Sequence, residues 1–415
     1  MRVVPRTRRA RRIILIAGGA MLLLAIVRQV TGAVELTSSA NFGAALRLAV
    51  PIALAGLGGL YAERTGIINI GLEGMMILGT WSAGWAGWHY GVWWGVAFGV
   101  LGGIAGALLH SVATVNFGVD HIISGVAINI LALGVARFLS VVIYVPGTGG
   151  GSTQSPRVQG DVGEFTLPFL AGGKLGPWRT PDLFGGLERL DWFLVSDIGG
   201  LLKGLTGRLS LLTIIALLLI PFTWWFLWRT PLGLRLRSAG ENPYAAESLG
   251  VPVYTVKHIG VLISGALAGL GGAFLVVEAA GIYREGQTGG RGFIGLASMI
   301  FGNWRPTGTW LGAGLFGFTD ALQLRSEGAV HALLLFLAVA LIAVALQRWR
   351  KPRAALVSLA GGAAFFTWFL VTDTVPNEFV FFTPHVVTIL VLVFASQRLR
   401  MPAADGLRYR KGEIQ

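Results

Sequence analysis

The side chains that could do chemistry in this sequence are polar residues inside long apolar runs. Asn69 and Glu73 lie four residues apart, which places them on one face of a helix. Asn129 and Glu278 lie within two other apolar runs. Polar groups are costly to place in lipid and are often functional there, and amides and carboxylates can pair with sugar hydroxyls and base edges. We therefore predict that these four residues line a solute path.

Two aromatic residues extend this prediction, and several polar residues have a simpler interpretation. Trp81 and Phe293 are aromatic residues suited to stacking on a base. Glu73, however, could equally cap a broken helix or pair with an arginine. Glu63 and Arg64 are interpreted as a surface pair at the membrane edge. These structural alternatives stay open at the level of sequence.

Several chemistries are excluded by what the sequence lacks. It contains no cysteine, so thiol catalysis, cysteine-ligated metals and disulfides are excluded. The six histidines are scattered, and no HExxH spacing indicates a metal site. No GxxxxGK[ST] segment is present, so we expect no P-loop and no ATP or other cofactor bound by this chain. The sequence does not predict an enzyme.

The elements that must position the candidate residues are apolar helices. Hydrophobic residues make up 54% of the 415 residues and charged residues only 13%, whereas soluble domains carry about 25% charged residues. Continuous apolar runs of about 20 residues cross a bilayer as helices rather than as barrel strands. The sequence predicts an all-α, polytopic membrane bundle of roughly ten to twelve spans from these runs: Ile13–Val27, Phe42–Leu60, Ile67–Trp88, Val92–Val115, His121–Val145, Leu209–Trp228, His258–Ala280, Phe293–Phe301 with Trp310–Leu324, Ala332–Leu346, Ala354–Val371 and Val380–Ser396.

Small residues predict close helix crossings and, as a hypothesis, an inverted repeat. The 61 glycines suit tight packing in lipid, as in the Gly265–Gly269 pair with its small-xxx-small spacing. Ile70–Trp81 is similar to Ile294–Trp304, and the span count makes the two copies run in opposite directions. Opposed repeats build two gates around one site in many transporters. Chance similarity between glycine-rich apolar segments is the alternative.

The net charge of +13 predicts topology rather than nucleic-acid binding. Basic residues gather before the first run, at Arg348–Arg353 and after Arg398, and such short basic segments stay cytoplasmic and attract anionic lipid. We therefore predict a protein of the cell inner membrane whose N-terminus and C-terminus both lie in the cytoplasm. The predicted regions are a basic leader 1–12, a first transmembrane half 13–145, an extracytoplasmic loop 146–207, a second half 208–347 that includes the loop 229–257, and C-terminal spans with a basic tail 348–415.

The cytoplasmic loop 229–257 contains the clearest local signal. Asn242 is a good helix N-cap, Pro243 suits the first helical position and Gly250 suits the position just past the end. The pattern predicts a separate helix, Pro243–Leu249, which is too short to cross a membrane and marginal in isolation. A partner protein that docks on this helix is one explanation. A connecting helix packed on the base of its own bundle is the other.

This loop and four other segments resemble one family. Gly240-Glu241-Asn242-Pro243 followed by Ala245-Ala246-x-x-Leu249-Gly250-Val251 resembles the coupling-helix region of ATP-binding-cassette permeases of the branched-chain amino acid, simple-sugar and nucleoside group. The resemblance is greatest to nucleoside-type permeases. The extra run Ala354–Val371 and the basic tail depart from the usual family length. The other matching segments are Tyr61–Met76, His121–Asn129, Gly290–Ala297 and Phe301–Trp304.

The resemblance implies a translocation subunit that has partners. These are a second permease (a paralogue or an identical copy), cytoplasmic ATPase subunits that use ATP and Mg, and an extracytoplasmic binding lipoprotein. It also implies that the coupling residues are Gly240, Glu241, Asn242, Pro243, Ala245, Ala246, Leu249 and Gly250. An ion-coupled secondary transporter is the alternative function, but it leaves the helix at Pro243 without a role.

Overall fold

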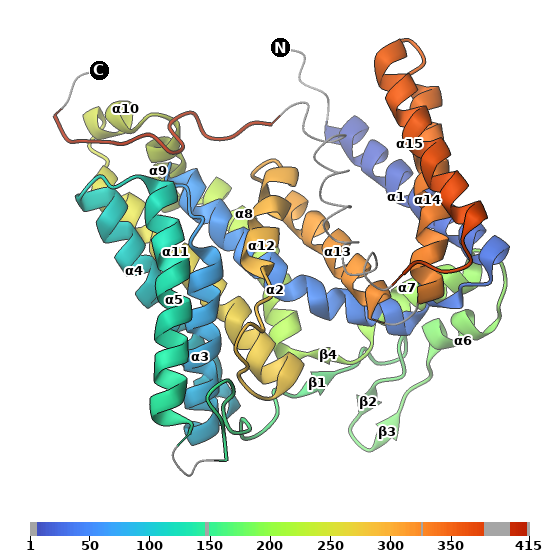
Figure 1. The fold of residues 1–415 in the computed structure, drawn as a ribbon, viewed down its shortest axis with the longest axis horizontal. Coiled ribbons are helices and arrows are strands. Elements are labelled where there is room, and N and C mark those ends of the chain that lie inside the picture. The colour runs from blue at the N-terminus through green and yellow to red at the C-terminus, as the bar shows by residue number, and fades with distance from the viewer. Residues whose placement is uncertain (1–5, 146–148, 325–326, 377–398, 413–415) are drawn as a thin grey trace. The chain divides into compact units, whose positions relative to one another are not determined.

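The computed structural model describes residues 6–145, 149–324, 327–376 and 399–412 (Figure 1). The described part is mostly helical, with 15 α-helices and four two-residue strands, as the apolar runs predict. Contacts within the chain group it into two units. One unit combines residues 1–46, 165–208 and 318–386, and the other combines residues 47–164, 209–317 and 387–415. We call them the loop unit and the core unit.

The core unit contains the predicted site residues. Its helices are the main part of α2 (Ser39–Arg64), α3 (Leu72–Tyr90), α4 (Val92–Ser111) with the π-helical turn η2 (Val112–Asn116), α5 (His121–Ile143), α8 (Leu211–Arg229), α9 (Pro231–Glu241), α10 (Pro243–Ser248), α11 (Val253–Phe274) with the π-helical turn η3 (Leu275–Ala280), α12 (Arg291–Phe301) and most of α13 (Pro306–Gln323). The short strands β1 (Glu164–Phe165) and β4 (Leu209–Ser210) lie at the boundaries of the units.

Glycine allows α3, α4 and α11 to pack closely. A Cβ atom at Gly103 would lie 2.1 Å from the carbonyl oxygen of Gly265, and one at Gly79 would lie 2.6 Å from the Cα atom of Gly269. Backbones at this separation exclude any larger side chain, which is the function of small-xxx-small spacing. The prediction of a tight crossing at Gly265 and Gly269 is confirmed.

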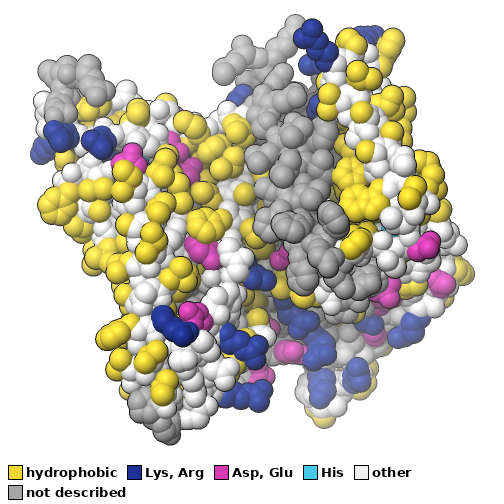
Figure 2. Space-filling model, viewed as in Figure 1, with side chains coloured by type: hydrophobic (Ala, Val, Ile, Leu, Met, Phe, Trp, Pro, Cys, Tyr) yellow, Lys and Arg dark blue, Asp and Glu magenta, His cyan; other side chains and the backbone are white. Residues whose placement is uncertain are grey.

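The outer surface of the core unit is apolar. On α5, the side chains of Ile123, Ile130 and Phe138 are each about two-thirds exposed. Figure 2 shows hydrophobic side chains covering much of the visible surface over α4 and α5. An apolar face of this size on a stable helix is typical of contact with lipid.

The loop unit contains the first helix, the loop after α5 and the late helices. Its elements are α1 (Arg6–Thr31), the 3₁₀ turn η1 (Val34–Thr37), β2 (Lys174–Leu175), β3 (Trp178–Arg179), α6 (Leu183–Arg189), α7 (Val195–Thr206), α14 (Glu327–Gln347) and α15 (Pro352–Val371). β2 and β3 form an antiparallel hairpin, and α14 packs against both α15 and α1. The sequence did not predict α6 or α7, because their segment mixes charge and glycine without a long apolar run.

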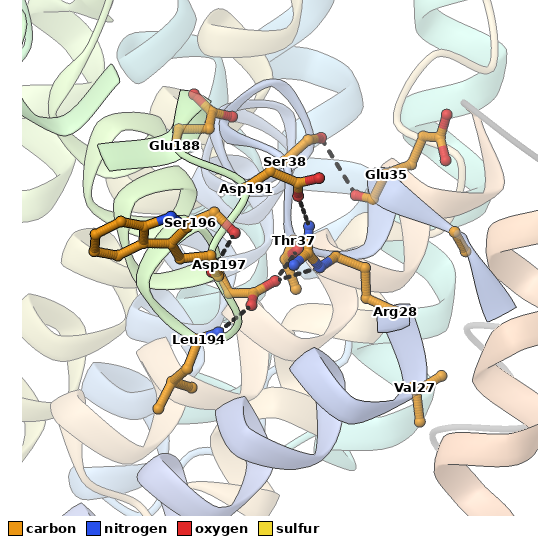
Figure 3. Close-up of polar contacts among 12 residues, drawn as sticks. Val27, Arg28, Glu35, Thr37, Ser38, Glu188, Asp191, Leu194, Ser196 and Asp197 are labelled. Carbon is orange, nitrogen blue, oxygen red and sulfur yellow. Dashed lines mark hydrogen bonds and ion pairs between the residues drawn. The ribbon is translucent and has the colours of Figure 1, made fainter. Parts of the chain in front are cut away.

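A buried ion cluster ties α1 to α7 (Figure 3). Arg28, in the last turn of α1, contacts Asp197 at 2.9 Å and Asp191 at 2.9 Å. Asp197 is fully buried and also accepts hydrogen bonds from the Thr37 hydroxyl and the Leu194 main-chain N–H. One carboxylate is thus satisfied by a cation, a hydroxyl and an amide, which is the condition for burying a charge without a large penalty.

Seven described helices are long and apolar enough to cross a membrane. They are Ser39–Arg64, Val92–Asn116, His121–Ile143, Leu211–Arg229, Val253–Ala280, Gly328–Gln347 and Pro352–Val371. The predicted runs at α1, α3, α12 and α13 are also helical, but their described residues do not meet the same criteria of length and hydropathy. The predicted run Val380–Ser396 lies outside the described residues. The structure is that of a multi-pass helical membrane protein, and a count of ten to twelve spans stays a prediction.

Candidate functional site

The short helix α10 forms where the local sequence predicts it. The side-chain Oδ1 of Asn242 accepts a hydrogen bond from the Ala245 N–H at 2.9 Å, and Pro243 occupies the first helical position. The helix ends at Ser248, one residue before the predicted end. Gly250 follows in the left-handed region with φ of +81°, which favours glycine.

One face of α10 is buried against its own chain and the other is exposed. Pro243 and Ala246 are buried, whereas Asn242 and Ala245 are exposed. Leu249, directly after the helix, is 85% exposed. The two interpretations of this helix are therefore compatible, because it packs on its bundle and still presents an apolar residue at its exposed end.

The preceding helix, α9, leads into α10 and packs against the end of α2. A Cβ atom at Gly240 would lie 2.3 Å from the Arg64 carbonyl oxygen, so the two backbones touch. The Arg64 guanidinium lies 3.9 Å from the Glu241 carboxylate and 5.4 Å from the centre of the Trp228 ring. The predicted coupling residues Gly240 and Glu241 are thus in contact with α2.

The chain between α2 and α3, residues 65–71, is a non-helical segment that we call the junction. Asn129 holds it from α5, because its Oδ1 accepts from the Gly74 N–H at 2.7 Å and its Nδ2 donates to the Ile70 carbonyl at 3.1 Å. Asn69 is fully buried and donates to the Ser264 hydroxyl at 2.9 Å. The Asn69 Oδ1 accepts no hydrogen bond from any residue that the structure describes.

Glu73, at the start of α3, binds the start of α12. Its two carboxylate oxygens accept hydrogen bonds from the main-chain N–H groups of Gly290 and Gly292, at 2.9 and 2.7 Å. A Cβ atom at Gly292 would lie 2.5 Å from the Glu73 nitrogen, so the approach requires glycine. Free N–H groups and the helix dipole make a helix N-terminus a favourable site for a carboxylate.

Two histidines hold the junction from other helices and were not predicted as site residues. His110 of α4 is fully buried, and its ring nitrogens lie 3.1 Å from the Ile68 carbonyl oxygen and 2.9 Å from the Ser124 hydroxyl. The ring of His121 accepts a hydrogen bond from the Ile68 N–H at 3.4 Å. A lone histidine inside an apolar run was the available signal for His110, but spacing alone does not identify its partner.

The structure brings together three of the six predicted path residues. Asn69 lies in the junction, Glu73 follows it at the start of α3, and Asn129 contacts it from α5. Phe293 lies on α12 beside the Glu73 contact and is 46% exposed. Trp81 lies further along α3 and donates to the Ser140 hydroxyl at 3.1 Å. Glu278 is in η3, where its carboxylate hydrogen-bonds Ser210. Their contact with a solute stays a prediction.

Glu63 and Arg64 are not the surface pair predicted from sequence. Glu63 is only 4% exposed and accepts a hydrogen bond from the Trp304 indole N–H. Arg64 donates to the Trp304 carbonyl oxygen at 2.6 Å. The prediction was wrong because the partners of both residues lie about 240 positions away in the chain.

A second acid joins Glu63 from the C-terminal tail. Asp405 is 8% exposed, hydrogen-bonds Glu63 and interacts electrostatically with the buried Lys257 at the start of α11. Burial raises the pKa of Asp405 to about 7. The only signal for this site in the sequence was a single acidic residue between the basic residues Arg400 and Arg408.

Comparison with known proteins places these features in one family. The family described as "Branched-chain amino acid transport system / permease component" matches residues 41–346. The guanosine ABC transporter permease protein NupQ of Bacillus subtilis is 31% identical over 379 residues, covering 89% of this chain and 96% of the relative.

Two further relatives agree. The nucleoside ABC transporter permease protein NupC of Lactococcus lactis is 32% identical, covering 88% of this chain and 94% of the relative. The putative glucose ABC transporter permease protein TsgC13 of Haloferax volcanii is 31% identical, covering 70% and 78%. No solved structure matches the chain. With its matched core, its apolar helices and its capped helix α10, this chain belongs to the family of permease components of ABC transporters.

Proposed function

We propose that this chain carries nucleosides into the cell as the membrane-spanning subunit of an ATP-driven importer. Two relatives, aligned over 94–96% of their own length, are named as guanosine and nucleoside permeases. This near end-to-end match is the observation that carries the proposal. The match to a putative glucose permease covers less of both chains and favours simple sugars less.

The path for the nucleoside is proposed to pass the α2–α3 junction. Asn69 and Asn129 supply amide groups, and Asn69 retains an acceptor that no described residue uses. A fully buried acceptor that lacks a partner is expensive, so a transient partner such as a hydroxyl or ring N–H of the solute would stabilise it. Glu73, Glu278, Trp81 and Phe293 complete the proposed set, with the aromatic rings available to stack on a base.

The ATPase partner is proposed to bind at α10. The proposed coupling set is Gly240, Glu241, Asn242, Pro243, Ala245, Ala246, Leu249 and Gly250. Gly240, Pro243 and Ala246 of this set are buried, the others are exposed, and Leu249 is its most exposed apolar side chain. ABC permeases act with ATPase and substrate-binding partners, and this chain has no P-loop of its own. ATP and Mg would be bound by that partner, in the cytoplasm. A second permease and an extracytoplasmic lipoprotein complete the assembly.

Contacts within the core unit support a placement of the ATPase and the lipoprotein on opposite sides of the membrane. Residues 153–158 pair with residues 281–285 beyond the C-terminal end of α11, and α9 and α10 contact its N-terminal end. The helix from Val253 to Ala280 has 28 residues, so these ends lie about 40 Å apart at 1.5 Å per residue. Residues 153–158 and the loop that carries α10 therefore lie at opposite ends of α11, as a topology with the two loops on opposite sides of the membrane requires.

Uptake in reconstituted vesicles tests the proposal. The chain is purified with its ATPase, its second permease and its lipoprotein, and labelled guanosine, ribose and glucose are offered in parallel. We expect guanosine uptake that requires ATP and persists when ionophores collapse the ion gradients. Preferred uptake of either sugar would contradict the nucleoside assignment. Uptake driven by an ion gradient without ATP would support the secondary-transporter alternative instead.

A further inference from the structure

The described end of the chain, residues 399–412, lies across the base of the core unit, and we call it the strap. Figure 1 shows it running beside α9 and α10. Some of its residues are buried and others are exposed: Pro402, Ala404, Asp405 and Tyr409 are buried, whereas Met401, Ala403, Leu407, Arg408 and Arg410 are exposed. A solvated tail would not show this pattern, so the strap is a docked element.

The main chain of the strap joins two segments that are far apart in the sequence. The Ala404 N–H donates to the Gly240 carbonyl at 2.9 Å, at the end of α9. Two residues later, the Gly406 N–H donates to the Gly66 carbonyl in the junction at 3.3 Å. A Cβ atom at Gly66 would lie 2.9 Å from the Ala404 carbonyl oxygen, so the three backbones pack without space for a side chain.

Two buried side chains anchor the strap at its sides. Asp405 enters between α2 and α11, where it meets Glu63 and Lys257. The Tyr409 ring packs against Tyr244 of α10 at 5.2 Å and Tyr254 of α11 at 5.5 Å between ring centres. The strap therefore contacts α10 directly as well as the end of α9.

We propose that the strap makes α9 and α10 move as one body with the junction, so that displacement of α10 by the ATPase reaches Gly66 and Asn69 through the strap. The inference rests on the proposed function and adds a transmission element to it. The junction is one non-helical segment between two helices, so a pull at Gly66 is transferred to Asn69 and to the Glu73 contact with α12.

The first test releases the strap without removing it. The double variant Asp405→Ala/Tyr409→Ala loses both buried anchors, and Leu407→Ala, a 59% exposed residue of the same segment, is the matched control. In vesicles, we expect the ATP hydrolysed per guanosine imported to rise at least about 5-fold in the double variant, the lower end of coupling between two sites in proteins. The ATPase should still co-purify, and Leu407→Ala should behave as wild type.

Two results would overturn the proposal. An unchanged ratio of ATP to guanosine in the double variant means that the strap transmits nothing. Loss of the ATPase from the purified complex means that the strap is a docking surface instead. The failure of the proposed function itself is distinct, because wild type would then show no ATP-dependent guanosine uptake at all.

A second test locks the strap in place. The chain has no cysteine, so Ala403→Cys/Glu241→Cys carries the only thiols, at positions where the Ala403 N–H lies 3.3 Å from the Glu241 carboxylate. We expect a short, reversible bis-thiosulfonate cross-link to leave uptake at the level of the two single-cysteine variants. Uptake that stops on cross-linking and returns on reduction would show that the strap must detach in each cycle, which contradicts movement as one body.

Discussion

The Glu73 carboxylate and the main-chain N–H of Gly292 form a 2.7 Å hydrogen bond between helices that start 219 residues apart. With the second bond, to Gly290, it makes Glu73 the cap of α12. From the sequence, Glu73 is predicted as a solute contact, and helix capping is the alternative. The two roles predict different outcomes when the side chain is changed.

For the capping role, we expect Glu73→Gln to lower the free energy of unfolding by about 1–3 kcal/mol, because one N–H would face an amide donor in a buried site. Thermal unfolding in detergent measures this, with the exposed Glu35→Gln as the matched control. A variant with unchanged stability and reduced guanosine uptake would instead assign Glu73 to the solute path.

Leu249 is the test of the surface that α10 presents. Burying a leucine side chain contributes about 1.5–3 kcal/mol, so Leu249→Ser is expected to weaken binding of the ATPase by roughly 10- to 100-fold. Leu175→Ser is the control, since Leu175 is 48% exposed in the β2–β3 hairpin of the loop predicted on the other side of the membrane. Titration of the ATPase onto the permease in nanodiscs measures both. Equal affinities would remove α10 from the interface.

Ala246→Pro tests transmission rather than binding. The Ala246 N–H donates to the Asn242 carbonyl at 3.0 Å, and proline would remove this bond within a six-residue helix at a cost of about 3 kcal/mol. We expect ATP hydrolysis to continue while guanosine uptake falls to the background level. Ser248→Ala, at an exposed position of the same helix outside the coupling set, should transport normally. Full coupled transport in Ala246→Pro would contradict the coupling role.

Local chemistry explains why α10 could be predicted and why the junction could not. Asn242, Pro243 and Gly250 act within eight residues of each other, so their order along the chain already contains the cap, the start and the end of the helix. The polar contacts of the junction depend on Asn129 and Ser264, which arrive from other helices. The sequence selected Asn69 and Asn129 as polar groups in apolar runs but contained no signal that they meet.

The late part of the chain was predicted least well for the same reason. Its runs at α14 and α15 were recognised from hydrophobicity alone. The docking of the strap depends on Asp405 and Tyr409, whose partners Glu63 and Tyr244 lie far away in the sequence. A basic tail predicts a cytoplasmic side. The burial of one acid within it cannot be predicted from the tail alone, because its partners come from distant segments of the chain.

Removal of one partner from the ion cluster of the loop unit should be severe. Arg28→Leu leaves Asp197 charged and buried, so we expect the free energy of unfolding to fall by about 3–5 kcal/mol. Asp191→Asn is the control: the Asp191 side chain is 83% exposed, and an exposed ion pair contributes about 0–1 kcal/mol. In a double-mutant cycle, Arg28→Leu/Asp197→Leu should lose less than the sum of the single variants. Additive losses would mean that the two groups do not interact.

The strap should also respond to pH. Burial is the largest cause that raises the pKa of Asp405 from 3.8 to about 7, and the charged groups that face it are Glu63, Lys257 and Arg64. A carboxyl group whose pKa is higher when docked binds more protons in the docked state. Docking is therefore strongest below pH 3.8, weakens as the pH rises from 3.8 to about 7, and changes little above that range.

Thiol labelling measures this dependence directly. Ala404→Cys places a thiol at a buried position of the strap, and Ala403→Cys places one at the exposed neighbour, which corrects for the effect of pH on thiol reactivity. We expect the labelling rate at 404 relative to 403 to increase between about pH 5 and 7 and to level off above. Adding Asp405→Asn should abolish the increase, because the amide does not titrate. An increase of the same size in the Asp405→Asn background would place the titrating group elsewhere, on Glu63 or Lys257.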